Sequence, residues 1–294
     1  MGVTLNHRRN GRTRMKTLST RVAAITGAGS GIGRALAVEL AAKGCHLALA
    51  DIDKAGLEET AEIVQRPGMR VTAHAVDVAN RDAVEEWAQQ VVEEHGSVHL
   101  VFNNAGVALG ATVEAMSYED FEWVMGVNFW GVVHGTKAFL PHLKAGGEGH
   151  IVNISSVFGL LGIPSQSAYN AAKFAVRGFT EALRIELDLE RSGVSCTTIH
   201  PGGIKTNIAR NARFDDSVEM FGQDPSSVVA ASERAFITSP EQAAKVILRA
   251  VEADKRRAMI GPDGHVFNLL AHLPPGVYQR VIGIGTRLGS RLSL

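Results

Sequence analysis

The sequence predicts an α/β protein, in which a doubly wound parallel sheet lies between two layers of helices as a three-layer sandwich in a single domain. Three observations predict this fold. Apolar segments of strand length alternate with helix patterns, a glycine-rich turn separates the first strand from the first helix, and no composition break or internal repeat divides the chain. Strands that alternate with helices are joined by right-handed crossovers, which make their sheet parallel.

The predicted elements follow one another in a regular order. The strands, recognised as short apolar segments, cover residues 21–26, 45–51, 69–77, 98–103, 149–155, 194–200 and 257–261. The helices, recognised by their amphipathic periodicity, cover residues 34–44, 54–66, 80–95, 117–143, 167–191 and 239–254. Ligands of such sheets bind beyond the carboxyl ends of the strands, so the residues at those ends are the candidates for function.

The segment that joins the first strand to the first helix is TGAGSGIG, residues 26–33. Glycines let the main chain turn tightly and approach a pyrophosphate, and the start of a helix presents free N–H groups to the anion. Glycines also make ordinary turns, so the strand before and the helix after are what favour a phosphate site. The candidate residues are Gly27, Gly29, Ser30, Gly31, Ile32 and Gly33.

The second predicted strand ends in an acid, Asp51. A carboxylate at this place can accept hydrogen bonds from the hydroxyls of an adenosine ribose, whereas it would repel a 2′-phosphate. The neighbouring positions hold Ser30 and Ile52 rather than Arg or Lys, so the sequence favours NAD over NADP as the cofactor. The alternative interpretation of Asp51 is a helix N-cap or a solvated loop acid.

Polar residues and glycines also follow the later strands. These segments are Asp77-Val78, Asn103-Asn104-Ala105-Gly106, Ser155-Ser156 and His200-Pro201-Gly202. Because the carboxyl ends of parallel strands meet at one edge of the sheet, we expect the segments to line one site. Any one of them could be an ordinary turn; their common place in the pattern indicates a ligand.

The segment from Asn153 to Lys173 carries the candidate chemistry. On a helix Tyr169 and Lys173 share one face, and Ser156 precedes the tyrosine by thirteen residues. An ammonium about 4 Å from a phenol, at an effective dielectric constant near 20, favours the phenolate by roughly 4 kcal/mol, or about three pKa units. The sequence therefore predicts a tyrosine of lowered pKa that transfers a proton, beside a serine that orients the substrate. The alternative is an amphipathic helix with both side chains on its surface.

Composition limits the class of protein. The 294 residues are 45% hydrophobic and 20% charged, and 30 basic side chains balance 30 acidic ones, so no overall field attracts nucleic acid. Cys45 and Cys196 lie in different predicted strands and form neither a disulfide framework nor a metal motif. We therefore expect a cytoplasmic protein without a metal site. No apolar segment reaches the length of a membrane span, and no secretory signal is recognised.

The N-terminal residues differ from the rest of the chain. They have no apolar periodicity and contain five basic side chains, Arg8, Arg9, Arg12, Arg14 and Lys16. We expect residues 1–18 to be a disordered basic extension, with Met15 as an alternative start of translation. A basic arm for targeting or for nucleic acid is the other interpretation.

The order and spacing of the motifs are similar to those of the short-chain dehydrogenases/reductases, which are NAD(P)-dependent enzymes with a single Rossmann-type domain. The resemblance covers about residues 20–262, and we expect the domain to cover residues 19–262. It rests on TGAGSGIG, Asp51, DV at 77–78, NNAG at 103–106, Asn128, ISS at 154–156, YNAAK at 169–173 and HPGGIKT at 200–206.

The resemblance implies catalytic roles for four residues. Tyr169 would donate or accept the proton, and Lys173 would lower the pKa of Tyr169 and hold the nicotinamide ribose. Ser156 would orient the reacting oxygen, with Ser155 as the competing serine. Asn128 would lie at a break in its helix and hold the lysine through a water; its alternative is a helix-breaking residue in the core.

The resemblance also assigns residues to the cofactor. The adenine would contact Asp77 and Val78. The border of the cofactor would be formed by Asn104, Ala105 and Gly106. The nicotinamide side would be lined by Pro201, Gly202, Ile204 and Thr206.

The implied reaction interconverts a secondary alcohol and a ketone by hydride transfer. We expect residues 207–238 to form a substrate lid. An apolar wall of Phe158, Leu160, Leu161 and Ile163 favours a largely apolar small-molecule substrate. Two other functions stay open: a catalytically silent dinucleotide-binding regulator or scaffold, and an epimerase or dehydratase on the same fold.

The tail, residues 263–294, extends past the part that resembles the family. It combines apolar residues with Arg280, Arg287 and Arg291, and we expect it to be helical. It could contact a partner subunit, the mouth of the substrate site or a membrane surface, and the first two are favoured over the membrane. The resemblance also implies a homodimer or homotetramer, formed through the helices at 117–143 and 167–191.

Overall fold

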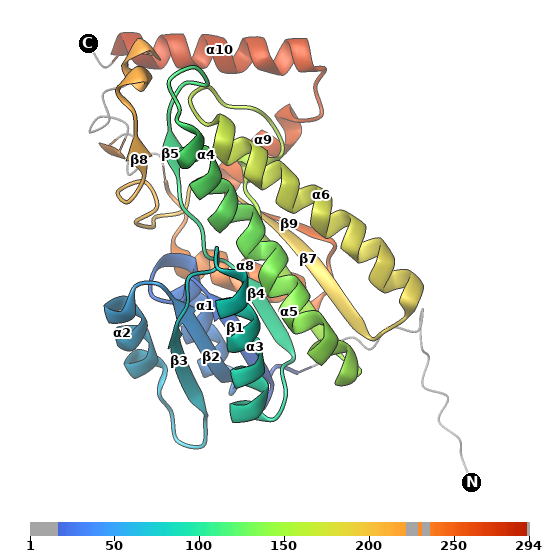
Figure 1. Ribbon diagram of the computed structural model, residues 1–294. Helices are drawn as coiled ribbons and strands as arrows, with labels where there is room; N and C mark the ends of the chain where they lie inside the picture. The colour runs from blue at the N-terminus through green and yellow to red at the C-terminus, as the bar shows by residue number, and fades with distance from the viewer. Residues whose placement is uncertain (1–16, 222–228, 231–235, 293–294) are drawn as a thin grey trace.

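The computed structural model of the protein describes residues 17–221, 229–230 and 236–292. Its central sheet has seven parallel strands in the order β3-β2-β1-β4-β6-β7-β9. The strands are β1 (Val22–Thr26), β2 (His46–Asp51), β3 (Val71–Ala75), β4 (Leu100–Asn103), β6 (Gly149–Ile154), β7 (Val194–Pro201) and β9 (Arg257–Ile260). This is the doubly wound Rossmann-type sandwich that the alternation predicted (Figure 1).

Helices cover both faces of the sheet (Figure 1). One layer consists of α1 (Gly31–Ala42), α2 (Lys54–Val64) and α8 (Pro240–Glu252). The other consists of α3 (Arg81–His95), α4 (Tyr118–Met125), α5 (Gly131–Ala145) and α6 (Ser167–Glu190). Along β1, Ala23 and Ile25 pack with the first layer and Val22 and Ala24 with the second. Both faces of the strand are buried, which is why unbroken apolar segments predicted the strands.

Side-chain caps set where several helices begin. Asp53, Asn80 and Ser117 accept hydrogen bonds from the first turns of α2, α3 and α4, and Ser239 forms a capping box with Gln242 at the start of α8. Each cap satisfies main-chain N–H groups that the helix leaves without partners. These junctions position the loops at the carboxyl edge of the sheet, where the predicted site lies.

The predicted helix 117–143 is interrupted by a π-helical turn, Gly126–Trp130, between α4 and α5, which is the break expected at Asn128. Two parts of the fold differ from the prediction. A small parallel sheet of β5 (Leu109–Gly110) and β8 (Arg213–Phe214) was not predicted, because strands of two residues have no readable pattern. Leu18, assigned to the N-terminal extension, is only 4% exposed and packs into the core, so the domain begins before residue 19.

The tail forms two helices, α9 (Pro262–Leu270) and α10 (Pro275–Leu292). Helix α10 crosses the end of the molecule where β5 and β8 lie (Figure 1) and contacts the short helix Asp216–Phe221. Of the expected lid, residues 222–228 and 231–235 lie outside the described residues.

Three further properties hold for the part of the chain that the structure describes. No helix there is both long and apolar enough to cross a bilayer. No group of three or more His, Cys, Asp or Glu side chains is arranged to hold a metal ion. The thiols of Cys45 and Cys196 are free and buried, and burial raises the pKa of each to about 12.

Candidate active site

The glycine turn is packed so closely that side chains are excluded from it. Gly27 has a positive φ of 65°, and a Cβ on Gly33 would lie 2.0 Å from the carbonyl oxygen of Gly27. The Asn104 side chain donates to the carbonyl oxygens of Thr26 and Gly27 at 2.9 and 3.2 Å. The loop after β4 therefore holds the turn between β1 and α1, which brings two predicted motifs together.

A Gly33→Ala substitution tests this packing. The added methyl group cannot fit without moving the turn, so we expect the free energy of unfolding to fall by about 1–3 kcal/mol and NAD binding to be lost. Gly178→Ala is the matched control, because a Cβ at this exposed position of α6 meets no atom within 4 Å. Urea unfolding and NAD titration measure both effects; equal behaviour of the two variants would contradict the close packing.

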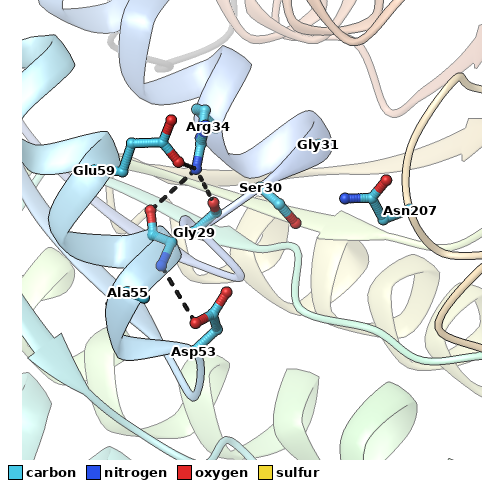
Figure 2. Close-up of a pocket in the computed structure, with 9 residues that line it drawn as sticks. Gly29, Ser30, Gly31, Arg34, Asp53, Ala55, Glu59 and Asn207 are labelled. Carbon is cyan, nitrogen blue, oxygen red and sulfur yellow. Dashed lines mark hydrogen bonds and ion pairs between the residues drawn. The ribbon is translucent and has the colours of Figure 1, made fainter.

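An open cleft of about 440 Å³ lies beside the turn (Figure 2). It is lined by Gly29, Ser30, Gly31, Arg34, Asp53, Ala55, Gly56, Glu59 and Asn207. The turn, the start of α2 and the segment after β7 thus meet at one place. Sequence reasoning missed Arg34 and Asn207, since neither belongs to a motif that predicts a ligand.

Asp51 lies at the end of β2, where it was predicted. Its carboxylate accepts hydrogen bonds from the main-chain N–H groups of Gly29 at 2.7 Å and Asp53 at 2.9 Å. The helix N-cap that was weighed for Asp51 is instead Asp53. Ile52 follows with 71% of its surface exposed.

Arg34 is the one Lys or Arg among the described residues that line the cleft. Its guanidinium donates to the carbonyl oxygens of Gly29 and Gly56 and to the carboxylate of Glu59, the last at 2.6 Å. The positive charge is therefore directed at acceptors of the protein itself, as Figure 2 shows.

The residues predicted to contact the adenine follow β3. Asp77 is exposed and accepts from the N–H of Ala79, whereas the Val78 side chain is buried and packs against Gly131. After β4, the N–H groups of Asn104 and Ala105 donate to the Thr26 hydroxyl at 3.0 and 3.1 Å. Thr26 was not predicted as a site residue; its hydroxyl joins two strand ends.

Ser156, Tyr169 and Lys173 are brought together by β6 and α6. Ser156 follows β6, and its side chain forms a hydrogen bond with Tyr169. Lys173 is 3% exposed, lies one helical turn after Tyr169, and donates to the carbonyl oxygen of Ile154 at 3.1 Å. Ser155, the competing serine, is directed away, because its hydroxyl donates to the main chain of Lys173. The geometry favours Ser156 as the serine of the site.

The predicted lowering of the tyrosine pKa is wrong for the structure described. Burial raises the pKa of Tyr169 to about 12, and the hydrogen bond with Ser156 acts in the opposite direction. The Lys173 ammonium lies 5.5 Å from the centre of the phenol ring and is held by the Ile154 carbonyl instead. Burial also lowers the pKa of Lys173 to about 8. Desolvation, which the spacing of residues in a sequence cannot show, dominates both groups.

Asn128 lies in the π-helical turn, and its side chain is fully buried. Its amide donates to the carbonyl oxygen of Val107 and accepts from the N–H of the same residue, each at 2.8 Å. A Cβ on Gly106 would lie 3.1 Å from Asn128 Oδ1 and 3.5 Å from Lys173 Nζ, so all three residues converge. The helix break was predicted; the water that links Asn128 to Lys173 stays a prediction.

The predicted nicotinamide side is formed by the end of β7 and the segment after it. Pro201 ends the strand, and Gly202 lies against Asp263 of α9. Thr206 reaches over the glycine turn, since a Cβ on Gly31 would lie 3.0 Å from Thr206 Cγ2. Ile204 is 4% exposed and packs into the core, so its side chain fixes the segment rather than facing a ligand.

Two polar side chains position the Ser156 segment: His200, which belongs to a strand end expected to line the site, and Asn170, which was not predicted as a site residue. His200 is fully buried, and its Nδ1–H donates to the Ser156 carbonyl at 2.8 Å; burial lowers its pKa to about 4, so the ring is neutral at pH 7. Asn170 donates to the carbonyl oxygens of Phe158 and Leu161 and accepts from the N–H of Ile163. Asn170 lies in the YNAAK motif, and its position next to Tyr169 is the sequence feature that could have identified it as a site residue.

Known proteins share the sequence pattern and the fold of this chain. The family model for short chain dehydrogenases matches residues 21–217. The chain belongs to the short-chain dehydrogenase/reductase family. It is therefore an NAD(P)-dependent oxidoreductase in the general sense that defines the family. The predicted resemblance is confirmed.

Individual relatives of this short-chain dehydrogenase cover most of its length. A Mycobacterium tuberculosis protein named as an oxidoreductase, SadH, is 48% identical over 272 residues, which are 92% of this chain and 97% of that protein. A Burkholderia phymatum short-chain dehydrogenase/reductase solved with NAD is 35% identical, with a TM-score of 0.78 over 87% of this chain and 94% of that one. A Thermococcus sibiricus alcohol dehydrogenase solved with 5-hydroxy-NADP is 32% identical, with a TM-score of 0.60 over 74% and 90%.

The residues of this short-chain dehydrogenase fit a dinucleotide. The main chain is bare where a phosphate would approach: a Cβ on Gly29 would lie 2.9 Å from Asp51 Oδ2, and one on Gly31 would meet Thr206. The start of α1 adds N–H groups and a positive helix end, which favour an anion. Gly29, Ser30, Gly31, Asp51 and Thr206 would therefore hold the cofactor on one side of the turn.

Proposed function

We propose that the protein interconverts a secondary alcohol and a ketone, with NAD as the hydride acceptor and NADH as the donor. The observation that carries this proposal is the convergence of Ser156, Tyr169 and Lys173 at the carboxyl edge of the sheet that also carries the glycine turn. The cofactor, when bound, supplies the hydride chemistry, and its oxidised form adds a positive charge.

In this proposal the protein orients the substrate and moves the proton. Ser156 holds the substrate oxygen. Tyr169 as a phenol gives its hydroxyl proton to a ketone, and in the reverse direction Tyr169 as a phenolate accepts the hydroxyl proton of an alcohol. Since burial raises the pKa of Tyr169 to about 12, the phenol form prevails at neutral pH, which suits proton donation to a ketone. Lys173 holds the nicotinamide ribose, and Asn128 fixes the loop at Gly106 next to the ammonium.

The substrate that we propose is a largely apolar small molecule. The Phe158 ring packs edge-on against Tyr169, with ring centres 6.0 Å apart, and so presents an apolar surface beside the phenol. Leu161, by contrast, is fully buried and packs the interior. We therefore assign Phe158, and not Leu161, to the apolar wall.

A substrate screen tests the reaction type. We expect secondary alcohols to produce NADH from NAD and ketones to consume NADH. Both reactions would give a net change in the absorbance of the nicotinamide. An epimerase or dehydratase would return the cofactor to its starting state, and a silent regulator would bind NAD without turnover. Either of those two outcomes would replace the proposal.

The preference for NAD over NADP is part of the proposal. Asp51 and Asp53 place two carboxylates beside the turn, and Arg34 is paired with Glu59. The 2′-phosphate of NADP would be repelled by these two acids, and Arg34 would not neutralise it because its charge is paired with Glu59.

Asp51→Ala tests the cofactor preference. Removal of the carboxylate takes away both the ribose acceptor and the repulsion, so we expect the ratio of NAD to NADP affinity to fall by roughly tenfold or more. Titration of both cofactors, with Asp82→Ala at an exposed position of α3 as the control, measures the ratio. A wild-type preference for NADP would contradict the role of Asp51.

We also propose that the protein forms a homodimer or homotetramer through the helices predicted for this role. Large apolar side chains are exposed on and between α4, α5 and α6: Tyr118, Trp130, Phe174, Ile185 and Leu189. Exposed apolar surface of this kind favours contact with another subunit. Sedimentation velocity tests the assembly.

A further inference from the structure

The tail helices α9 and α10 are called here the C-terminal arm (residues 262–292), and the inner face of α9 contacts segments of the candidate site. Asp263 of α9 accepts a hydrogen bond from the main-chain N–H of Gly203, in the segment predicted to line the nicotinamide side, at 2.5 Å. Phe267 packs against Phe158, with ring centres 6.4 Å apart, and Phe158 packs against Tyr169. The arm therefore lies beside the mouth of the site.

The outer face of the arm is apolar and exposed. On α9, Val266 and Leu269 expose 58% and 70% of their surface, and on α10, Val277, Val281 and Ile284 expose 46%, 46% and 58%. The three α10 residues recur at the spacing of one helix face. An exposed apolar stripe of this kind favours a contact with a partner or a membrane.

The charges of α10 favour an anionic surface as that partner. The helix contains no acidic residue, and the exposed Arg280 stands beside the stripe of Val277, Val281 and Ile284. An amphipathic helix with basic residues next to its apolar face lies in the plane of a bilayer surface and is attracted by anionic headgroups.

A second copy of the chain fits this face less well. Two identical arms docked stripe to stripe would place Arg280 of each copy against a helix α10 that offers no carboxylate to pair with it. We propose that the C-terminal arm docks on an anionic lipid bilayer surface, with Val277, Val281 and Ile284 in the headgroup region. Of the three roles that the tail sequence left open, the inner face serves the substrate mouth and the outer face serves the membrane.

Vesicle co-sedimentation tests the proposal with the full chain. We expect wild-type protein to bind vesicles of phosphatidylcholine and phosphatidylglycerol, and to bind phosphatidylcholine vesicles weakly. The double variant Val281→Glu, Ile284→Glu is expected to lose roughly tenfold or more in affinity for the anionic vesicles. Val113→Glu, at a position of 75% exposure outside the arm, is the matched control and is expected to bind like the wild type.

Arg280→Gln tests the electrostatic contribution to vesicle binding. Loss of one charge near the surface is expected to weaken binding to anionic vesicles about fivefold, to leave binding to phosphatidylcholine vesicles unchanged, and to reduce the salt dependence. Thermal melts of each variant establish that the fold is retained.

Two outcomes would overturn the docking surface. One is absence of wild-type binding to anionic vesicles at low salt, or equal binding by the double glutamate variant. The other is a monomer–dimer equilibrium that the same glutamates abolish while no variant binds vesicles, which would make the face a contact between copies. Failure of the proposed reaction would appear in the substrate screen and would leave vesicle binding intact.

Discussion

Tyr169→Phe is expected to lower kcat by about 10²–10⁴-fold, because the substitution removes the only hydroxyl proposed to transfer the proton. The phenyl ring keeps its edge-on contact with Phe158, so the pocket retains its shape. NAD affinity is expected to change little. The measurement is the rate of NADH formation from an alcohol identified by the substrate screen, together with a titration of NAD.

The chain offers a matched control for this experiment. Tyr118 begins α4 and is 87% exposed, so Tyr118→Phe removes a hydroxyl that has no proposed role. It is expected to turn over like the wild type. If Tyr169→Phe kept more than about a tenth of the wild-type rate, proton transfer by Tyr169 would be excluded.

Lys173→Met is expected to remove activity by a similar factor while it changes the pH dependence of stability. Burial lowers the pKa of Lys173 from 10.5 to about 8 in the folded protein. Between these values the unfolded chain binds a proton at this residue and the folded chain does not, so the wild-type protein gains stability as pH rises. Below pH 8 both states are charged, and the buried ammonium opposes folding.

The variant lacks this titration. Relative to Lys173→Met, the free energy of unfolding of the wild type is therefore expected to increase by about 2 kcal/mol between pH 8 and pH 10. Urea unfolding of the cofactor-free proteins at several pH values measures the difference. Lys137→Met, at an exposed position of α5, is the control. A wild-type curve parallel to that of Lys173→Met would show that Lys173 is better solvated than its burial implies.

Much of the fold could be predicted from the sequence, for a physical reason. Strands buried on both faces must be apolar throughout, and the turn at Gly27 and Gly33 tolerates no Cβ, so both features leave a local pattern. The placement of Asp51 and Ser156 followed from the rule that strand ends share one edge, and the pairing of Tyr169 with Lys173 followed from their spacing on a helix. These are properties of short segments and of their order.

The parts that could not be predicted depend on contacts between distant segments. Thr26 supports the loop after β4, His200 supports Ser156, and Asp263 holds Gly203 across 60 residues of chain. None of these partners can be recognised before the fold is known. The pKa of Tyr169 belongs to the same class, because its direction depends on how much water the folded site excludes.

The hydrogen bond from Gly203 to Asp263 joins the dinucleotide-binding domain to the tail, two regions that the sequence alone divides at residue 262. Linkage makes such a coupling reciprocal: whatever tightens one partner tightens the other by the same free energy. If binding of the nicotinamide ordered the segment at Gly203, it would also stabilise the position of α9. By the same coupling, an arm bound to lipid would raise the affinity of the site for the nicotinamide. The fraction of protein that holds the cofactor would then depend on whether the arm is bound to a membrane.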